Sequence, residues 1–125
     1  MKSRRDPRGL EHGPVFSWHR TQDGWIYTSG HAAVDVDDLA IKPGEFRHEA
    51  RMTLENLRRT LERAGSSMAK VVKVTAYFTD LNDFPIFNTI YAEFFPGDMP
   101  PARTCVEVKR LPYNFKVEIE AVAHV

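Results

Sequence analysis

Hydrophobic and polar residues alternate in several segments of this chain and recur every three or four residues in others. Two alternating segments lie near the C-terminus, at residues 102–108 and 116–123. Successive side chains of an extended chain point to opposite faces of a sheet, so both segments are predicted strands. The apolar face of the second segment consists of Val117, Ile119, Ala121 and Ala123. Glu118 and Glu120 point the opposite way.

The connection between these two segments contains Pro112 and Asn114, residues that favour a turn. We therefore expect the two strands to be antiparallel neighbours. One face of the pair would then be core, and the other would carry Arg103, Cys105 and Glu107 together with the two glutamates. A solvated outer face would show the same pattern. A polar face covered by a partner subunit is the alternative.

A helical period begins at residue 46, where apolar residues recur at spacings of three and four. This pattern predicts a helix over residues 46–64 with one buried face. The buried positions are Phe46, Ala50, Leu54, Leu57, Leu61 and Ala64. Gly65 ends the helix. His48 and Glu49 fall within it and are expected at its surface.

The remaining segments complete the set of predicted elements. Residues 13–19 and 25–29 alternate as strands around an Asp23-Gly24 turn. The β-branched run at residues 70–79 is typical of a central strand. A second helix is expected from residue 84 to about residue 95, with an aromatic inner side.

In chain order the elements are two strands, a helix, a strand, a helix and two strands. This order favours an α+β architecture, a mostly antiparallel sheet with both helices on one face. The face without helices is expected to carry Arg103, Cys105, Glu107, Glu118 and Glu120. We expect a single domain over residues 1–125, with residues 1–11 as a flexible tail.

Composition narrows the possible partners and compartment. Seventeen basic and seventeen acidic side chains cancel, so nucleic acid and anionic membranes are not expected as partners. One cysteine cannot form an internal disulfide, and nothing points to secretion. No apolar run follows the basic N-terminus, and none approaches the roughly 20 residues of a spanning helix. We therefore expect a cytoplasmic protein.

No metal or organic cofactor is expected. The predicted loop at residues 34–44 contains Asp35, Asp37 and Asp38, but it lacks the glycine and distal glutamate of a calcium loop. A solvated acidic loop fits better. Five histidines are scattered at spacings that do not match a metal site. Phosphate-binding loops and nucleophile elbows are absent from the sequence.

Two groups of residues could carry chemistry. Cys105 next to Arg103 could be a nucleophile, although small buried cysteines are common in strands and inert. The guanidinium of Arg103 suits a carboxylate, and Glu118 could hold or activate a water molecule. Together they could bind a small acid and hydrate an adjacent electrophilic carbon. A structural salt bridge between neighbouring strands is the alternative.

Several motifs resemble the RidA/YjgF family of enamine/imine deaminases. The C-terminal signature is matched by PARTCVEV at residues 101–108, by Leu111-Pro112 and by VEIEA at residues 117–121. Further matches are Tyr27-Thr28-Ser29-Gly30, Leu54-Glu55-Asn56-Leu57, Ala64-Gly65, Asp80-Leu81-Asn82-Asp83-Phe84, Asn88 and Tyr91. They extend from Gly13 to Ala123.

This resemblance implies a chorismate-mutase-like α+β fold and a homotrimer with sites in the clefts between subunits. By the resemblance, Arg103 holds the substrate carboxylate and Glu118 positions the attacking water. The same cleft is lined by Ser29, Gly30, Asn88 and Cys105. The implied reaction hydrolyses a 2-imino or enamino acid to a 2-keto acid and ammonia, without a metal or organic cofactor.

The chain departs from the family pattern in the pocket wall. Val15 and His31 stand where tyrosine and glutamine are common, Glu49 replaces a helical glutamine, and Phe16 and Trp18 make the N-terminal segment bulkier. Substrate identity therefore stays open. A larger catabolic enamine of the aminomuconate or aminoacrylate type is one alternative. A non-catalytic trimeric protein that binds small carboxylates is another.

Overall fold

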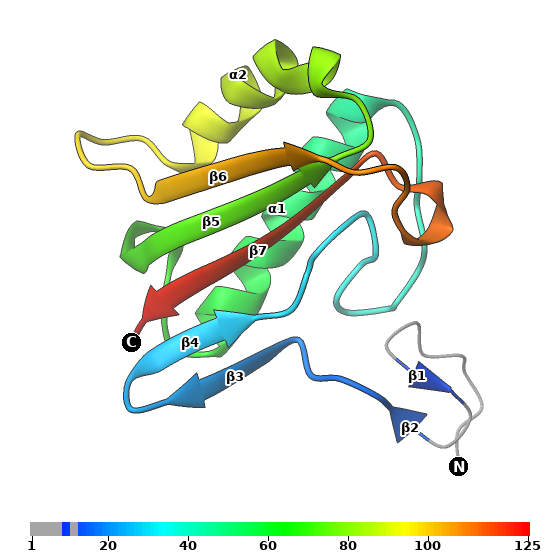
Figure 1. Cartoon of the computed structure of the whole chain (residues 1–125). Coiled ribbons are helices and arrows are strands. Elements are labelled where there is room, and N and C mark those ends of the chain that lie inside the picture. Colours follow the sequence, from blue (N-terminus) through cyan, green and yellow to red (C-terminus); the bar gives the residue numbers. More distant parts are fainter. Residues whose placement is uncertain (1–8, 11–12) are drawn as a thin grey trace.

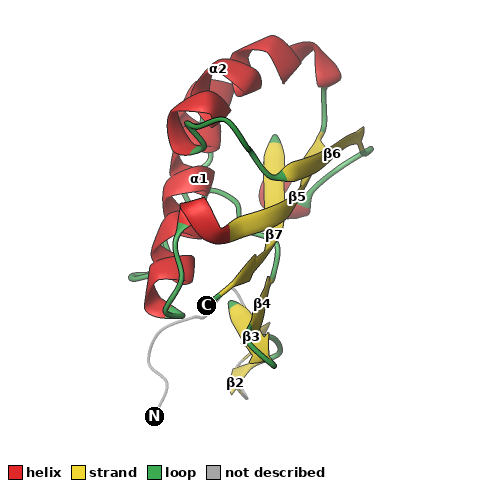
Figure 2. Cartoon of the chain, turned by 90° about the vertical axis from the view of Figure 1, so that its left-hand side faces the viewer, coloured by secondary structure: helices red, strands yellow, loops and turns green. Residues whose placement is uncertain are grey.

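The computed structural model describes residues 9–10 and 13–125. Its centre is a five-stranded sheet, and both long helices pack on one face of that sheet (Figures 1 and 2). The α+β prediction is confirmed. The flexible tail expected at residues 1–11 lies outside the described residues, apart from a two-residue strand at Gly9–Leu10.

The strands of the main sheet follow the order β3-β4-β7-β5-β6. Their bounds are β3 His19–Gln22, β4 Trp25–Thr28, β5 Val71–Phe78, β6 Ala102–Glu107 and β7 Val117–His124. The helices are α1 Phe46–Arg63 and α2 Phe84–Phe94, and the short strands β1 Gly9–Leu10 and β2 Gly13–Pro14 form a separate pair. Three 3-10 turns are η1 Met68–Lys70, η2 Leu81–Asp83 and η3 Pro112–Asn114. All pairs in the main sheet are antiparallel except β5 with β6.

Helix α1 forms where the apolar period predicted it. Leu54, Leu57 and Leu61 are fully buried against the sheet. The helix ends at Arg63, and Gly65 then adopts a φ of +87°, a left-handed conformation that glycine accepts without steric cost. The predicted end at residue 64 is therefore correct to within one residue.

An aromatic cluster joins α1, α2 and the sheet. The rings of Phe78 and Phe87 meet edge to face with centroids 4.9 Å apart, and Phe46 stacks on Phe78 at 6.0 Å. Edge-to-face aromatic pairs add about 0.5–1.5 kcal/mol beyond their buried area. The inner side predicted for the second helix is confirmed, because Phe87, Ile90 and Tyr91 are buried.

The predicted pairing of the two C-terminal strands is wrong. Strand β5 lies between β6 and β7 and pairs with both of them (Figure 1). The connection at residues 108–116 therefore crosses the end of β5 instead of forming a hairpin. The prediction of a central strand at residues 70–79 is confirmed, since β5 is bonded on both sides.

This topology also changes which residues share a face. Arg103 is the register partner of Val74, and register partners point to the same face of a sheet. Val74 is fully buried under the helices, so Arg103 lies on the helix side. Glu118 pairs instead with Tyr77, on the open side. Placing Arg103, Cys105 and Glu107 on the same face as Glu118 and Glu120 was wrong.

The N-terminal region also differs from the prediction. The strand expected over residues 13–19 is interrupted, because β2 ends at Pro14 and β3 begins at His19. Residues 15–18 between them are irregular. The predicted turn is confirmed, with φ values of 53° at Asp23 and 81° at Gly24.

Candidate functional site

A pocket of about 330 Å³ lies beside Glu118. Its polar side consists of Ser29, Gly30 and Glu118, three residues that the sequence placed in the substrate cleft. The rest of the lining is mainly apolar and includes Phe16, Trp18, Tyr113 and Phe115. Strand β7 supplies the carboxylate, and the segment that follows β4 supplies the serine and the glycine.

A pair of backbone hydrogen bonds fixes Gly30 next to Glu118. The His31 amide donates to the Ile119 carbonyl at 2.7 Å, and the Ile119 amide donates to the His31 carbonyl at 2.8 Å. Gly30 and Glu118, which precede His31 and Ile119 in their segments, therefore lie side by side. A Cβ at position 30 would stand 2.7 Å from Cδ of Glu118, so the carboxylate occupies space that only glycine leaves open.

The environment of Glu118 favours its protonated form. Burial raises the pKa of the Glu118 carboxyl, and the nearby negative charge of Glu120 raises it further. Tyr77, the register partner of Glu118, also has a raised pKa, through burial and then through the charge of Glu120. A carboxylate whose pKa is raised toward neutrality is a better proton acceptor than one in water.

His31 supports this arrangement from inside the protein. The side chain is 0 % exposed, and Nδ1 lies 2.9 Å from the Ser29 carbonyl while Nε2 lies 2.7 Å from the Thr60 hydroxyl. Since a carbonyl can only accept, Nδ1 carries the proton and Nε2 accepts from Thr60. Burial lowers the pKa of His31 to about 4, so the ring is neutral at pH 7.

Ser29 holds the irregular segment of residues 15–18 over the pocket. Its hydroxyl donates to the Ser17 carbonyl at 2.5 Å, and its amide donates to the Trp18 carbonyl at 2.9 Å. Phe16 and Trp18 are thereby placed in the pocket wall. The hydroxyl proton of Ser29 is used within the chain, which leaves the oxygen lone pairs of Ser29 for a ligand.

Arg103 lies in a second hollow at the edge strand β6. Its guanidinium carbon lies over three rings of α2, at 5.3 Å from the ring centre of Phe84, 5.7 Å from that of Phe87 and 4.7 Å from that of Tyr91. Cation–π contacts of this kind orient a guanidinium plane. None of the ion pairs among the described residues involves Arg103. The salt bridge considered as its structural role therefore does not occur within the described chain.

Polar atoms without partners accompany this arginine. Asn88 Oδ1 and the Tyr91 hydroxyl are buried and make no hydrogen bond with the described residues. Asn88 lies one turn after Phe84 and one before Tyr91, so it shares the α2 face beneath the guanidinium. Unsatisfied buried polar groups are rare in folded proteins and mark places where a ligand or water completes the structure.

Cys105 lines the same hollow as Arg103 and is half-buried. Burial raises the pKa of the Cys105 thiol, while the charges of Arg103 and Lys73 act in the opposite direction. The thiol is therefore protonated at neutral pH, which does not favour the nucleophile considered from the sequence.

Within one chain the two groups of residues stay apart. Glu118, Ser29 and Gly30 lie together in the pocket on the open side of the sheet. Arg103 and Cys105 lie together at the β6 edge, on the helix side. The chain thus carries a carboxylate in a pocket and, apart from it, a guanidinium with its own hollow and without an ion-pair partner among the described residues.

Glu49 is a buried residue that the sequence prediction placed at the surface. It is 0 % exposed, and its carboxylate accepts from the amides of Lys116 at 2.7 Å and Gly44 at 3.1 Å. The surface prediction was wrong because these two amides satisfy the buried carboxylate. Its position three residues after Phe46, on the apolar face, was a signal in the sequence. Glu49 fixes the start of β7 and therefore the strand that carries Glu118.

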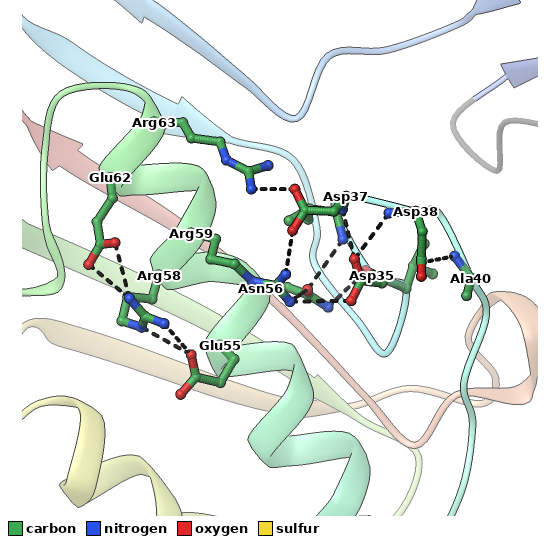
Figure 3. A network of polar contacts seen from close by, with 12 residues as sticks. Asp35, Asp37, Asp38, Ala40, Glu55, Asn56, Arg58, Arg59, Glu62 and Arg63 are labelled. Carbon is green, nitrogen blue, oxygen red and sulfur yellow. Dashed lines mark hydrogen bonds and ion pairs between the residues drawn. The ribbon is translucent and has the colours of Figure 1, made fainter.

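The acidic loop is tied to helix α1 by arginines (Figure 3). Arg59 contacts Asp37 at 2.7 Å and Asp35 at 3.5 Å, and Arg63 also pairs with Asp37. Asp35 and Asp37 thus pair with arginines of α1, while Asp37 and Asp38 remain exposed to solvent, as expected for a solvated acidic loop. Among the described residues no cluster of three or more histidine, cysteine, aspartate or glutamate side chains could hold a metal ion.

Comparison with known proteins assigns the family. The family model for Endoribonuclease L-PSP matches residues 15–125, and the chain belongs to this family. It is 42 % identical over 100 residues to a RutC family protein from Pyrococcus horikoshii, covering 80 % of this chain and 79 % of that protein. It is 40 % identical over 100 residues to the putative reactive intermediate deaminase TdcF of Escherichia coli, covering 78 % and 77 %.

Solved structures agree with this assignment. The crystal structure of E. coli TdcF with bound serine matches with a TM-score of 0.83 at 35 % identity and covers 99 % of this chain and 96 % of that one. The E. coli YjgF gene product matches with a TM-score of 0.82 at 34 % identity, covering 95 % and 92 %. The resemblance to the RidA/YjgF proteins is confirmed, and with it an α+β fold of that type. At family level the chain is related to reactive intermediate deaminases.

None of the helices in the described part of the chain is long and apolar enough to span a membrane.

Proposed function

We propose that this protein is a deaminase that hydrolyses reactive 2-imino acids, or their enamine tautomers, to 2-keto acids and ammonia. The observation that carries the proposal is the Glu118 carboxylate, held with a raised pKa against the backbone of Gly30 in an apolar pocket. A hydrolase of a neutral or cationic C=N bond needs a positioned base to activate water. Glu118 has the chemistry and the surroundings for that role.

In the proposed reaction Arg103 binds the substrate carboxylate through two parallel hydrogen bonds. Glu118 accepts a proton from a water molecule as the water oxygen attacks C2 of the protonated imine. The product is a carbinolamine. Its nitrogen takes up a proton, ammonia leaves with the C–N bonding electrons, and loss of the hydroxyl proton gives the keto acid. Atoms balance with water as the only co-reactant, and no redox step occurs.

The complete site would form between subunits of a homotrimer. Arg103 and Glu118 lie on opposite faces of one sheet, so one chain cannot place both around a small substrate. The open sheet face also carries exposed apolar side chains, including Trp25, Tyr27 and Val106. Exposed apolar surface of this kind marks an interface. A neighbouring copy that covers this face could bring its Arg103 to the Glu118 pocket.

The serine bound in E. coli TdcF supports the substrate class. Serine carries a carboxylate next to a carbon bonded to nitrogen, the same arrangement as in a 2-imino acid. In this chain the unpaired guanidinium of Arg103 would receive such a carboxylate. The buried oxygen of Asn88 lies on the helix face beneath that guanidinium and would complete the polar surroundings.

Two other functions fit the site less well. The family description names an endoribonuclease, but a phosphate group would meet the Glu118 carboxylate in a pocket with an apolar wall. A protein that only binds small carboxylates would need Arg103 but no second carboxylate with a raised pKa. Release of ammonia and keto acid from imines generated in situ tests the proposal directly. Turnover no faster than spontaneous hydrolysis across a panel of imines would contradict it.

A further inference from the structure

The apolar wall of the Glu118 pocket is mainly aromatic. Phe16 and Trp18 meet edge to face with centroids 5.6 Å apart, and Trp18 packs on the buried His31 ring at 5.0 Å. Phe115 is 2 % exposed and belongs to the small core beneath the pocket, against which Trp18 also packs. Tyr113, with a left-handed φ of 58°, is 51 % exposed at the rim.

The charge of the pocket is one-sided. Of the described residues that line it, Glu118 is the only one with a carboxylic acid side chain, and none has a basic side chain. A second carboxylate at the end of the substrate side chain would therefore face Glu118, a group of like charge, and the Arg103 proposed to come from the neighbouring subunit would already be bound to the other carboxylate of the substrate. This disfavours the aminomuconate type of substrate, which has such a group. An uncharged apolar side chain meets no such repulsion when it enters the pocket.

The size of the pocket exceeds what a small side chain needs. About 330 Å³ lies at the lower end of the roughly 300–1,000 Å³ typical of small-molecule sites. With the reacting carbon at Glu118, a methyl group would leave most of the aromatic wall in contact with water. A benzyl or branched alkyl group would reach Phe16 and Trp18 and displace that water.

From this geometry we propose that the preferred substrates are 2-imino acids with bulky apolar side chains, aryl or branched alkyl. The inference rests on the proposed function and leaves its chemistry unchanged: water adds to C2, and ammonia is released. The substrate carboxylate points to Arg103 of the neighbouring subunit. The side chain extends along the wall formed by Phe16, Trp18 and Phe115.

A panel of imines tests this preference. Imines are generated in situ from alanine, leucine, phenylalanine and glutamate with an oxidase suited to each, and kcat/KM is measured above the spontaneous rate. The phenylalanine- and leucine-derived imines should exceed the alanine-derived imine roughly 10-fold or more, as expected for a few methylene groups in an apolar pocket. The glutamate-derived imine should be the poorest substrate.

Two variants connect the preference to the wall. Phe16→Ala removes a ring that is 39 % exposed and should lower the phenylalanine-to-alanine ratio of kcat/KM several-fold. Trp18→Ala should lower the ratio roughly 10-fold. Phe16→Ala keeps the test valid if Trp18→Ala does not fold, because Trp18 also packs on His31. Met99→Ala is the control, since Met99 is 92 % exposed and does not line the pocket.

The outcomes separate this inference from the proposed function. Hydrolysis of no imine in the panel would overturn the function, and the inference with it. Hydrolysis with the alanine-derived imine preferred, or with a ratio unchanged in folded Phe16→Ala protein, would overturn the inference alone. A ratio that falls in the wall variants and not in Met99→Ala supports both.

Discussion

The backbone of Gly30 lies directly against the side chain of Glu118. A Cβ at position 30 would stand 2.7 Å from Cδ and 3.0 Å from Cγ of the glutamate, closer than side chains pack. Hydrogen bonds between His31 and Ile119 keep the two segments in this register. The carboxylate can point into the pocket at this place because residue 30 has no side chain.

Gly30→Ala should therefore displace the carboxylate without unfolding the protein. A displacement of about 1 Å can cost 10²-fold in rate, so we expect kcat/KM for imine hydrolysis to fall roughly 10²-fold. Gly65→Ala is the matched control, because Gly65 has a positive φ but no neighbour within 4 Å of an added Cβ. It should lower the melting temperature and leave kcat/KM unchanged. Full activity of folded Gly30→Ala protein would show that the position of Glu118 is not critical.

Glu118→Gln should remove the proposed base while keeping the shape of the side chain. We expect kcat to fall roughly 10²-fold or more, in line with general-base contributions, while the protein stays folded. In the unmodified protein kcat/KM should rise with pH through the raised pKa of Glu118, because only the carboxylate form accepts a proton. A pH–rate profile should lose this acid limb in the variant.

Glu120→Gln is a second informative variant for the pH–rate profile, because Glu120 lies near Glu118. Its negative charge contributes to the raised pKa of Glu118. Removing the charge should shift the acid limb to lower pH and leave the maximal rate within a few-fold of normal. A loss of activity in Glu120→Gln as large as that in Glu118→Gln would show that Glu118 had been wrongly assigned as the catalytic base.

The buried His31 should make stability depend on pH. In the unfolded chain the histidine titrates near 6.5, whereas in the folded protein its pKa is about 4. Between these values the unfolded state binds the proton and the native state does not. The free energy of unfolding should therefore fall as the pH is lowered from about 6.5 to about 4, by up to about 1.4 kcal/mol per pH unit.

His31→Gln isolates this contribution because glutamine does not titrate. Denaturant unfolding of both proteins across this pH range, with the difference taken at each pH, cancels the groups that they share. The difference between the free energies of unfolding should change with pH by about 3 kcal/mol over the whole range. Parallel curves would show that His31 is not held neutral in the native state.

Activity should depend on the shape of the cationic group at position 103. Each charge-assisted hydrogen bond contributes about 1.5–3 kcal/mol, so Arg103→Ala should lower kcat/KM roughly 10²-fold or more. Arg103→Lys keeps the charge but lacks the planar pair of donors, and should stay badly impaired. Thermal unfolding of the same preparations measures how much Arg103 contributes to the free energy of unfolding. We expect about 0.5–1 kcal/mol, the value for an exposed cation–π contact. Near-normal turnover in stable Arg103→Ala protein would contradict the assigned role.

Much of the fold could be predicted because its signals are local. The three-and-four spacing of apolar residues gave helix α1 to within one residue, and the Asp23-Gly24 pair gave the β3–β4 turn. The element order gave the helix layer on one face. The motif at residues 27–30 and the motif at 117–121 gave both sides of the Glu118 pocket, through the resemblance to a family.

The position of Arg103 could not be predicted, because alternation does not show which strands are neighbours or which face is covered. Val106 alternates with Arg103 and Cys105 and therefore fell on the predicted core face, yet it is exposed on the open face, while the guanidinium of Arg103 lies over the aromatic rings of α2. The burial of Glu49 was not predicted for a related reason. A carboxylate is expected outside unless its partners are known, and those partners, Gly44 and Lys116, come from other parts of the chain.

The central claim is that Arg103 and Glu118 of one site come from different subunits. It predicts that two inactive variants can complement each other, because the Arg103→Ala chain still supplies Glu118 and the Glu118→Gln chain still supplies Arg103. In every trimer that contains both kinds of chain, about one site in three combines an intact Glu118 from one subunit with an intact Arg103 from its neighbour.

Co-expression of Arg103→Ala and Glu118→Gln chains, each with its own purification tag, allows mixed assemblies to be isolated and assayed. Ammonia release from an in situ imine by the isolated mixed assemblies should recover to about a third of the activity of the unmodified protein. Sedimentation of the same sample gives the size of the assembly, which we expect to be a trimer. Mixed assemblies that are no more active than either variant alone would contradict a site shared between subunits.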